Sequence, residues 1–129
     1  MSVLERIKDR IGAFAGYETA DGRRLADEQV RAYAGERLAA LGAGALEALK
    51  PEERERYDRV LLRCEFRNQQ TFSIFETGPG PQRIAALLDA DALLLDAAAS
   101  LQASGGPNLG ARLRDVEAAF EKRDSAMTA

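Results

Sequence analysis

The sequence predicts an all-α protein, a compact antiparallel bundle of four to five helices. Three observations support this fold class. Apolar residues recur three or four positions apart along most of the chain. Hydrophobic residues make up 46% and charged residues 30% of the composition, whereas aromatic residues make up only 6%, which is typical of a soluble helical domain. Glycine and proline gather in short clusters such as "TGPGP" and "SGGPN", which interrupt the periodic segments.

The chain length and the helical periodicity define the expected organisation. With 129 residues, the chain has the size of one ordinary domain, so we expect a single helical-bundle domain over residues 1–129. The expected helices span about residues 3–14, 22–41, 52–76, 81–103 and 108–123.

The first two expected helices are separated by a break between Gly16 and Gly22. Ser2 and Glu5 have the spacing of a capping box at the start of the first helix. Gly42 follows the second helix as a candidate C-cap, and residues 43–50 are expected to form a connector with one apolar turn. The apolar stripes of these two helices consist of Leu4, Ile7, Ile11 and Phe14, and of Leu25 or Ala26, Val30, Tyr33, Ala34, Leu38 and Leu41.

The expected central helix begins after Pro51, because proline fits the first turn of a helix. Its inward stripe consists of Tyr57, Leu61, Cys64, Asn68, Thr71 or Phe72, and Phe75. Residues 70–77 also alternate and are rich in aromatic and β-branched residues, so a strand is the alternative for this segment. A strand must pair, and no other segment offers a comparable partner, so the helix is favoured.

The last two expected helices begin at Pro81 and near Asn108, a candidate N-cap. Leu109, Leu113, Val116 and Phe120 give the final helix its stripe. Residues 124–129 are expected to fray, as chain ends often do.

The composition excludes several kinds of chemistry. The chain has no histidine, which removes His-dependent nucleophilic triads, the commonest zinc sites and haem bound through a proximal His. The single cysteine, Cys64, cannot form an internal disulfide and is expected to pack in the core. We therefore expect no enzymatic activity, no cofactor and no metal.

Charge and hydropathy also bear on location and partners. The formal net charge of −3 gives no global attraction to nucleic acid or to anionic membranes. Asp89, Asp91 and Asp96 interrupt the longest apolar run, so that run is not expected to span a membrane. The first residues lack the apolar core of a secretory signal. These features predict a cytoplasmic protein.

A row of arginines at helical spacing is the most prominent charged feature. Arg56, Arg59, Arg63 and Arg67 share one side of the expected central helix. A hairpin at "TGPGP" would place this row opposite Asp89, Asp91 and Asp96 on the next helix. The row could then consist of ion pairs that fix the register, or part of it could bind an anion or an acidic partner. The sequence leaves both alternatives open.

Two polar residues are expected to enter the core at one height. Asn68 and Asp91 both lie on apolar stripes, and burying either without a hydrogen bond costs about 1–3 kcal/mol. A mutual network that fixes register or pairing is one interpretation, and a ligand pocket or subunit contact is the other. The ligand or interface candidates are therefore Arg63, Arg67, Asn68, Gln69, Gln70 and Asp91.

These observations predict a helical interaction protein, homo-oligomeric or of adaptor type, with protein as the expected partner. The alternative is a small-ligand or anion-binding sensor bundle with a polar pocket around Asn68 and Asp91.

Overall fold

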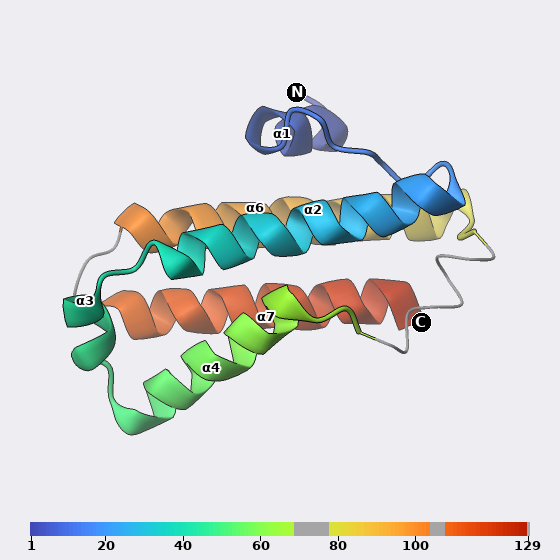
Figure 1. The fold of residues 1–129 in the computed structure, drawn as a ribbon. Helices are drawn as coiled ribbons and strands as arrows, with labels where there is room; N and C mark the ends of the chain where they lie inside the picture. The colour runs from blue at the N-terminus through green and yellow to red at the C-terminus, as the bar shows by residue number, and fades with distance from the viewer. Residues whose placement is uncertain (69–77, 104–107, 129) are drawn as a thin grey trace.

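The computed structural model of the chain describes residues 1–68, 78–103 and 108–128 (Figure 1). These residues form helices and their connections, with no strand among them, which confirms the predicted all-α bundle. The elements are α1 (Val3–Arg10), α2 (Ala20–Ala39), α3 (Ala43–Glu47), α4 (Pro51–Glu65), α6 (Pro81–Ala99), the 3-10 helix η2 (Ser100–Ala103) and α7 (Leu109–Thr128).

The three long helices α2, α6 and α7 form the body of the bundle. In Figure 1, α2 and α6 run in the same direction, and α7 runs in the opposite direction. α6 packs against α7, α2 and α1, whereas α4 packs against α2 and α7. The side chains that are both large and completely buried are Ile7, Val30, Leu38, Val60, Leu87, Leu94, Leu95, Leu101, Leu113 and Val116.

The predicted start signals act as expected at several helices. The backbone N–H of Glu5 donates to Oγ of Ser2 at 3.1 Å, which caps α1. Thr19, which the sequence analysis did not single out, caps α2 in the same way and accepts from the N–H of Gly22 at 2.9 Å. Pro51 and Pro81 occupy the first turns of α4 and α6, where a missing N–H costs little.

The segment after α1 turns into the core earlier than predicted. The expected helix over residues 3–14 ends at Arg10, because Ile11 is extended, with φ −126°. Gly16 then adopts φ +76°, a conformation that L side chains rarely adopt. This turn buries Phe14 and Tyr17, whose rings meet edge to face with centroids 5.8 Å apart. Phe14 is therefore a core residue, as predicted, but it reaches the core from a loop.

The predicted central helix, 52–76, ends early at Glu65. Phe66 is extended, with φ −122° and ψ 130°, so Arg67 and Asn68 lie beyond the helix. The asparagine side chain competes for backbone hydrogen bonds, and asparagine is a weaker helix former than leucine or alanine, which favours a stop before Asn68. The helix-or-strand alternative for residues 70–77 falls outside the described residues.

The predicted hairpin between the central helix and the next one is wrong. Among the described residues, α4 packs mainly on α2 and α7, and it ends at Glu65, well before α6 begins at Pro81. α7 also continues to Thr128, past the predicted end at residue 123. Met127, in the segment expected to fray, is only 3% exposed.

Candidate functional site

The arginine row of α4 forms ion pairs with α7. Nε of Arg56 and Nε of Arg59 each donate to a carboxylate oxygen of Glu117 at 3.0 Å. One turn further along, Nη2 of Arg63 donates to Oδ2 of Asp124 at 2.6 Å. These three arginines therefore fix the packing of α4 on α7, and the predicted acidic partners on α6 were wrong.

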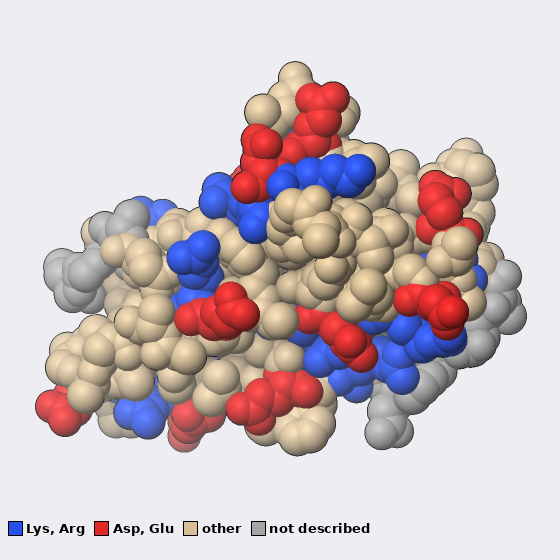
Figure 2. All heavy atoms as spheres, turned by 45° about the horizontal axis from the view of Figure 1, so that its top comes forward, with Lys and Arg blue, Asp and Glu red and all other residues tan. Residues whose placement is uncertain are grey.

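Asp96 on α6 is engaged elsewhere. Its carboxylate accepts from Arg6 at 2.5 Å and from Arg10 at 3.0 Å, both on α1. Both arginines and Asp96 remain partly exposed. On the face shown in Figure 2, acidic and basic side chains are interspersed.

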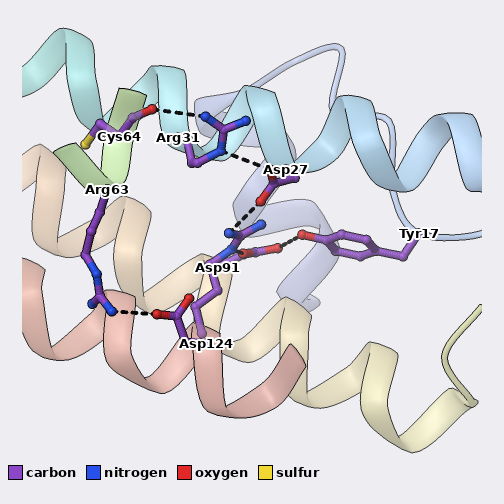
Figure 3. Close-up of polar contacts among 8 residues, drawn as sticks. Tyr17, Asp27, Arg31, Arg63, Cys64, Asp91 and Asp124 are labelled. Carbon is purple, nitrogen blue, oxygen red and sulfur yellow. Dashed lines mark hydrogen bonds and ion pairs between the residues drawn. The ribbon is translucent and has the colours of Figure 1, made fainter. Parts of the chain in front are cut away.

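A second set of charges lies inside the bundle and is centred on Arg123 of α7. Figure 3 labels its partners Asp27 and Asp91, with Tyr17 beside Asp91. Arg123 is 2% exposed and Asp91 of α6 is completely buried. Nε of Arg123 donates to Oδ1 of Asp91 at 2.6 Å, and the hydroxyl of Tyr17 donates to Oδ2 of the same carboxylate. Asp91 thus points inward, as predicted, but its partners are Arg123 and Tyr17.

Asp27 of α2 extends this buried network toward α4. Its Oδ1 accepts from Nη1 of Arg123 at 2.8 Å, and its Oδ2 accepts from Nε of Arg31 at 2.9 Å. Nη1 of Arg31 then donates to the backbone carbonyl of Cys64 at 3.2 Å (Figure 3). We call these five side chains the buried network: Tyr17, Asp27, Arg31, Asp91 and Arg123.

The buried network contains two arginines and two aspartates, and its environment shifts the pKa values of Tyr17, Asp91 and Arg123. Burial raises the pKa of Asp91, while the adjacent Arg123 opposes that shift. Burial also raises the pKa of Tyr17 well above its usual value, and the Asp91 carboxylate adds to the effect. Burial by itself lowers the pKa of Arg123, but Asp91, Tyr17 and Asp27 together raise it well above its usual value. Arg123 is therefore charged and Tyr17 neutral near neutral pH.

One donor of the buried network is not satisfied. Nη2 of Arg123 has no hydrogen-bond partner among the described residues. Leaving a buried donor unpaired costs about 1–3 kcal/mol. Arg31 is also only partly engaged, because its two hydrogen bonds use Nε and Nη1 and leave Nη2 outside these contacts. The network is rich in donors relative to its acceptors.

A groove of about 350 Å³ lies beside the buried network, and we call it the α4–α7 groove. Its apolar side chains come from α4, from Phe66 at the end of α4, and from α7. Its charged side chains come from α2, α4 and α7. Asn68, just beyond α4, also lines it. The lining residues are Asp27, Arg31, Leu62, Arg63, Phe66, Asn68, Phe120, Arg123, Asp124 and Met127.

The structure brings together some of the sequence-predicted candidates. Arg63 and Asn68 line the α4–α7 groove, whereas Arg67 lies beyond α4 and is not among the lining residues. Asp91 does not line the groove, but it accepts a hydrogen bond from Arg123, which does. Gln69 and Gln70 lie outside the described residues. Of the two residues of the predicted pocket, Asn68 lines this groove and Asp91 does not.

Sequence reasoning missed Tyr17, Asp27, Arg31 and Arg123. A signal for Arg123 was present, because Phe120, Arg123 and Met127 continue the stripe of α7 at spacings of three and four. Asp27 and Arg31 form an i,i+4 pair beside the buried Val30. Tyr17 follows Gly16 in a break between helices, where no periodicity marks it as a core residue.

Comparisons of the chain with protein-family models, curated proteins and solved structures find no match. Within the described parts of the chain, no helix has the length and apolar character needed to cross a membrane. Function is therefore argued from the physical chemistry of the buried network and the α4–α7 groove.

Proposed function

We propose that the protein is a non-enzymatic bundle that binds a small amphipathic molecule in the α4–α7 groove. The main observation behind this proposal is that apolar side chains and arginine donors line the same cavity. Ligand sites are commonly cavities of about 300–1,000 Å³ with mostly apolar walls and a few convergent polar groups. The groove, at about 350 Å³, lies within this range.

The apolar wall has exposed surface for a ligand to cover. Leu62 is 56% exposed and Phe66 is 66% exposed, although both are large apolar side chains. On the other side of the groove, Phe120 and Met127 are each 3% exposed and provide a packed base. Covering apolar surface stabilises a complex by about 25 cal/mol for each Å² removed from water.

The polar wall is pre-organised. Arg31 is held from two directions, by the Asp27 carboxylate and by the Cys64 carbonyl. A side chain that is already ordered loses little conformational entropy when a ligand arrives. The buried network therefore supports the groove by fixing its donors before binding.

The protonation states of Tyr17 and Arg123 favour a binding role over proton transfer for these two groups. A general acid or base works best when its pKa lies near the working pH. The pKa values of Tyr17 and Arg123 are both raised well above their usual values, so neither group exchanges a proton easily near neutral pH.

The proposal is tested by calorimetric titration with eight-carbon amphipaths, namely octanol, octanoate and octylammonium. At least one should bind saturably with one site per chain, and Leu62→Asp should weaken that binding at least tenfold. Leu25→Asp is the matched control, because Leu25 is 48% exposed on α2 and does not line the groove. No saturable binding, or equal effects of the two variants, would reject the groove as a ligand site.

A second candidate function is self-association through the same surface. Leu62 and Phe66 lie one turn apart and border the groove. In a twofold dimer, the exposed side chains of each copy could fill the groove of the other, since such an interface uses one patch twice. This candidate keeps the interaction role expected from the sequence.

Sedimentation velocity distinguishes the second candidate. Self-association predicts a dimer at high micromolar concentration that Phe66→Asp dissociates and Leu93→Asp leaves intact, because Leu93 is exposed on α6 away from the groove. A monomer at every concentration rejects self-association and leaves the groove open for a small ligand.

A further inference from the structure

We infer that the α4–α7 groove selects an uncharged ligand whose head group is a hydrogen-bond-accepting oxygen, as in an alcohol, a ketone or an ester. The inference rests on the proposed ligand-binding function and names the chemical class of the ligand. Two observations carry it. Each charged side chain described in the lining already has a partner of opposite charge, and one buried donor at the groove has no acceptor.

Two ion pairs join side chains that both line the groove. Nε of Arg31 lies 2.9 Å from Oδ2 of Asp27. Nη2 of Arg63 lies 2.6 Å from Oδ2 of Asp124. Figure 3 shows both pairs as dashed contacts. A charge that entered the groove would lie near both signs of each pair, so attraction to one member would be offset by repulsion from the other.

The third lining arginine, Arg123, is engaged by two carboxylates of the buried network. Its Nε donates to Asp91 at 2.6 Å and its Nη1 donates to Asp27 at 2.8 Å. Its positive charge is therefore already compensated from within the bundle. The sequence over residues 69–77 and 104–107, outside the described ranges, contains neither lysine nor arginine, so it supplies no further cation for an anionic ligand.

A charged head group would lose its hydration in the groove without gaining a counter-ion. An ionised carboxylate or ammonium group loses far more free energy on leaving water than a hydroxyl or carbonyl group does. The apolar part of the lining, which includes Leu62, Phe66 and Phe120, cannot replace that hydration. The groove therefore favours a head group without a formal charge.

The unpaired donor then defines the polarity of the head group. Arg123 lines the groove and is 2% exposed, and its Nη2 has no hydrogen-bond partner among the described residues. A guanidinium N–H only donates, so the group that satisfies it must be an acceptor. Because Nη2 is buried, this acceptor has to be small enough to reach the base of the groove, as a single hydroxyl or carbonyl oxygen is. The apolar body of the ligand then covers Leu62 and Phe66.

The test compares four probes that each have eight carbons, namely octanol, 2-octanone, octanoate and octylammonium, by calorimetric titration at neutral pH. Octanol and 2-octanone should each bind roughly tenfold more tightly than either ion. Since 2-octanone accepts but does not donate, equal binding of the two uncharged probes assigns the head group as an acceptor. The affinity of octanoate should rise as the pH falls through the pKa of the free acid, while that of octanol stays constant.

Variants of the more exposed ion pair test the role of charge pairing. Arg63→Gln removes a cation paired with Asp124, so it should shift the preference of the groove toward octylammonium. Asp124→Asn should shift it toward octanoate. The controls are Arg54→Gln and Asp58→Asn, because these two residues form an exposed ion pair on the same helix and do not line the groove. Equal weakening of all four probes by Arg63→Gln and Asp124→Asn would contradict the role of pairing.

The unaltered protein tests the acceptor assignment. In ¹⁵N-labelled wild type, the side-chain Nε–H signal of Arg123 should shift as octanol or 2-octanone saturates the groove. Shifts confined to the backbone amides of Leu62 and Phe66, with the Arg123 signal unchanged, would show that the ligand oxygen does not reach this donor.

The outcomes separate this inference from the proposed function. If either ion binds more tightly than octanol, the groove binds ligands but does not select an uncharged one. If all four probes bind equally, the apolar walls alone bind them and the inference is wrong. If none of the four binds, both the inference and the ligand-binding function are rejected.

Discussion

Arg123 and Asp91 form a buried ion pair between α7 and α6, with Nε of Arg123 2.6 Å from Oδ1 of Asp91. Removing two charges from water costs several kcal/mol for each ion, so such a pair is maintained only by good geometry and further hydrogen bonds. Tyr17 supplies a second donor to Asp91, and Asp27 supplies a second acceptor to Arg123. The pair therefore depends on residues from α2, α6 and α7 and from the segment between α1 and α2.

Arg123→Met should destabilise the protein by about 3–5 kcal/mol, because it leaves two buried carboxylates without their shared cation. Urea unfolding monitored by circular dichroism measures the loss. Arg114→Met, at an exposed position of the same helix, should change the free energy of unfolding by less than about 0.5 kcal/mol. Equal effects of the two substitutions would show that Arg123 does not hold the core together.

Tyr17→Phe should cost about 1–3 kcal/mol, because the buried carboxylate of Asp91 loses one of its donors. The same variant tests the titration of Tyr17. Because the pKa of Tyr17 is raised well above its usual value of 10.0, its phenol should stay neutral until the protein unfolds in base. Ultraviolet titration of wild type and Tyr17→Phe should therefore coincide up to the unfolding transition. An extra ionisation in the native wild type would refute the burial of Tyr17.

Glu117→Gln should make the free energy of unfolding depend less on pH in the acid range. Hydrogen bonds from Arg59 and Arg56 lower the pKa of Glu117 below its usual value of 4.5. The folded state therefore binds this proton less readily than the unfolded state, and the stabilisation is present above 4.5 and lost as the pH falls through the folded pKa.

The wild type should accordingly exceed Glu117→Gln in stability at neutral pH, by up to about 1 kcal/mol because the pairs are partly exposed. This difference in stability between the two proteins should disappear as the pH falls through the folded pKa of Glu117. Urea midpoints measured across the acid range check this expectation, and a difference that grows as the pH falls would have the wrong sign.

The thiol of Cys64 should react slowly in the native state. Cys64 is 7% exposed, and burial raises its pKa to about 12, so little of the nucleophilic thiolate is present near neutral pH. The rate of labelling with a disulfide reagent should rise as urea populates the unfolded state. Immediate labelling without urea would place this side chain at the surface.

The sequence predicted the helices through periodicity and start signals, and the clearest cases are Ser2, Pro51 and Pro81. These signals depend on residues that are only a few positions apart, so they can be read from a single sequence. The end of α4 was harder to predict, because Phe66 and Asn68 continue the helical stripe although Phe66 leaves the helix. Periodicity alone does not distinguish a buried helical turn from apolar residues that border a groove.

The candidate site was predictable only in part, because its partners are far apart in the sequence. Asp91 was expected to point inward, and it does. Its partner Arg123 lies 32 residues away, on α7, which packs against α6. The predicted end at residue 76 lies well past Glu65, and the acidic partners of Arg63 were expected on α6, whereas Arg63 pairs with Asp124 of α7.

A heteronuclear NMR titration of the ¹⁵N-labelled protein with octanol, octanoate and octylammonium tests the central claim, that the α4–α7 groove binds a small amphipathic molecule, most directly. The account predicts saturable shifts in the amides of Leu62, Phe66 and Phe120 and in the side-chain Nε–H of Arg31. Shifts centred instead on Leu93 and the outer face of α6, or no saturable shifts at all, would contradict it.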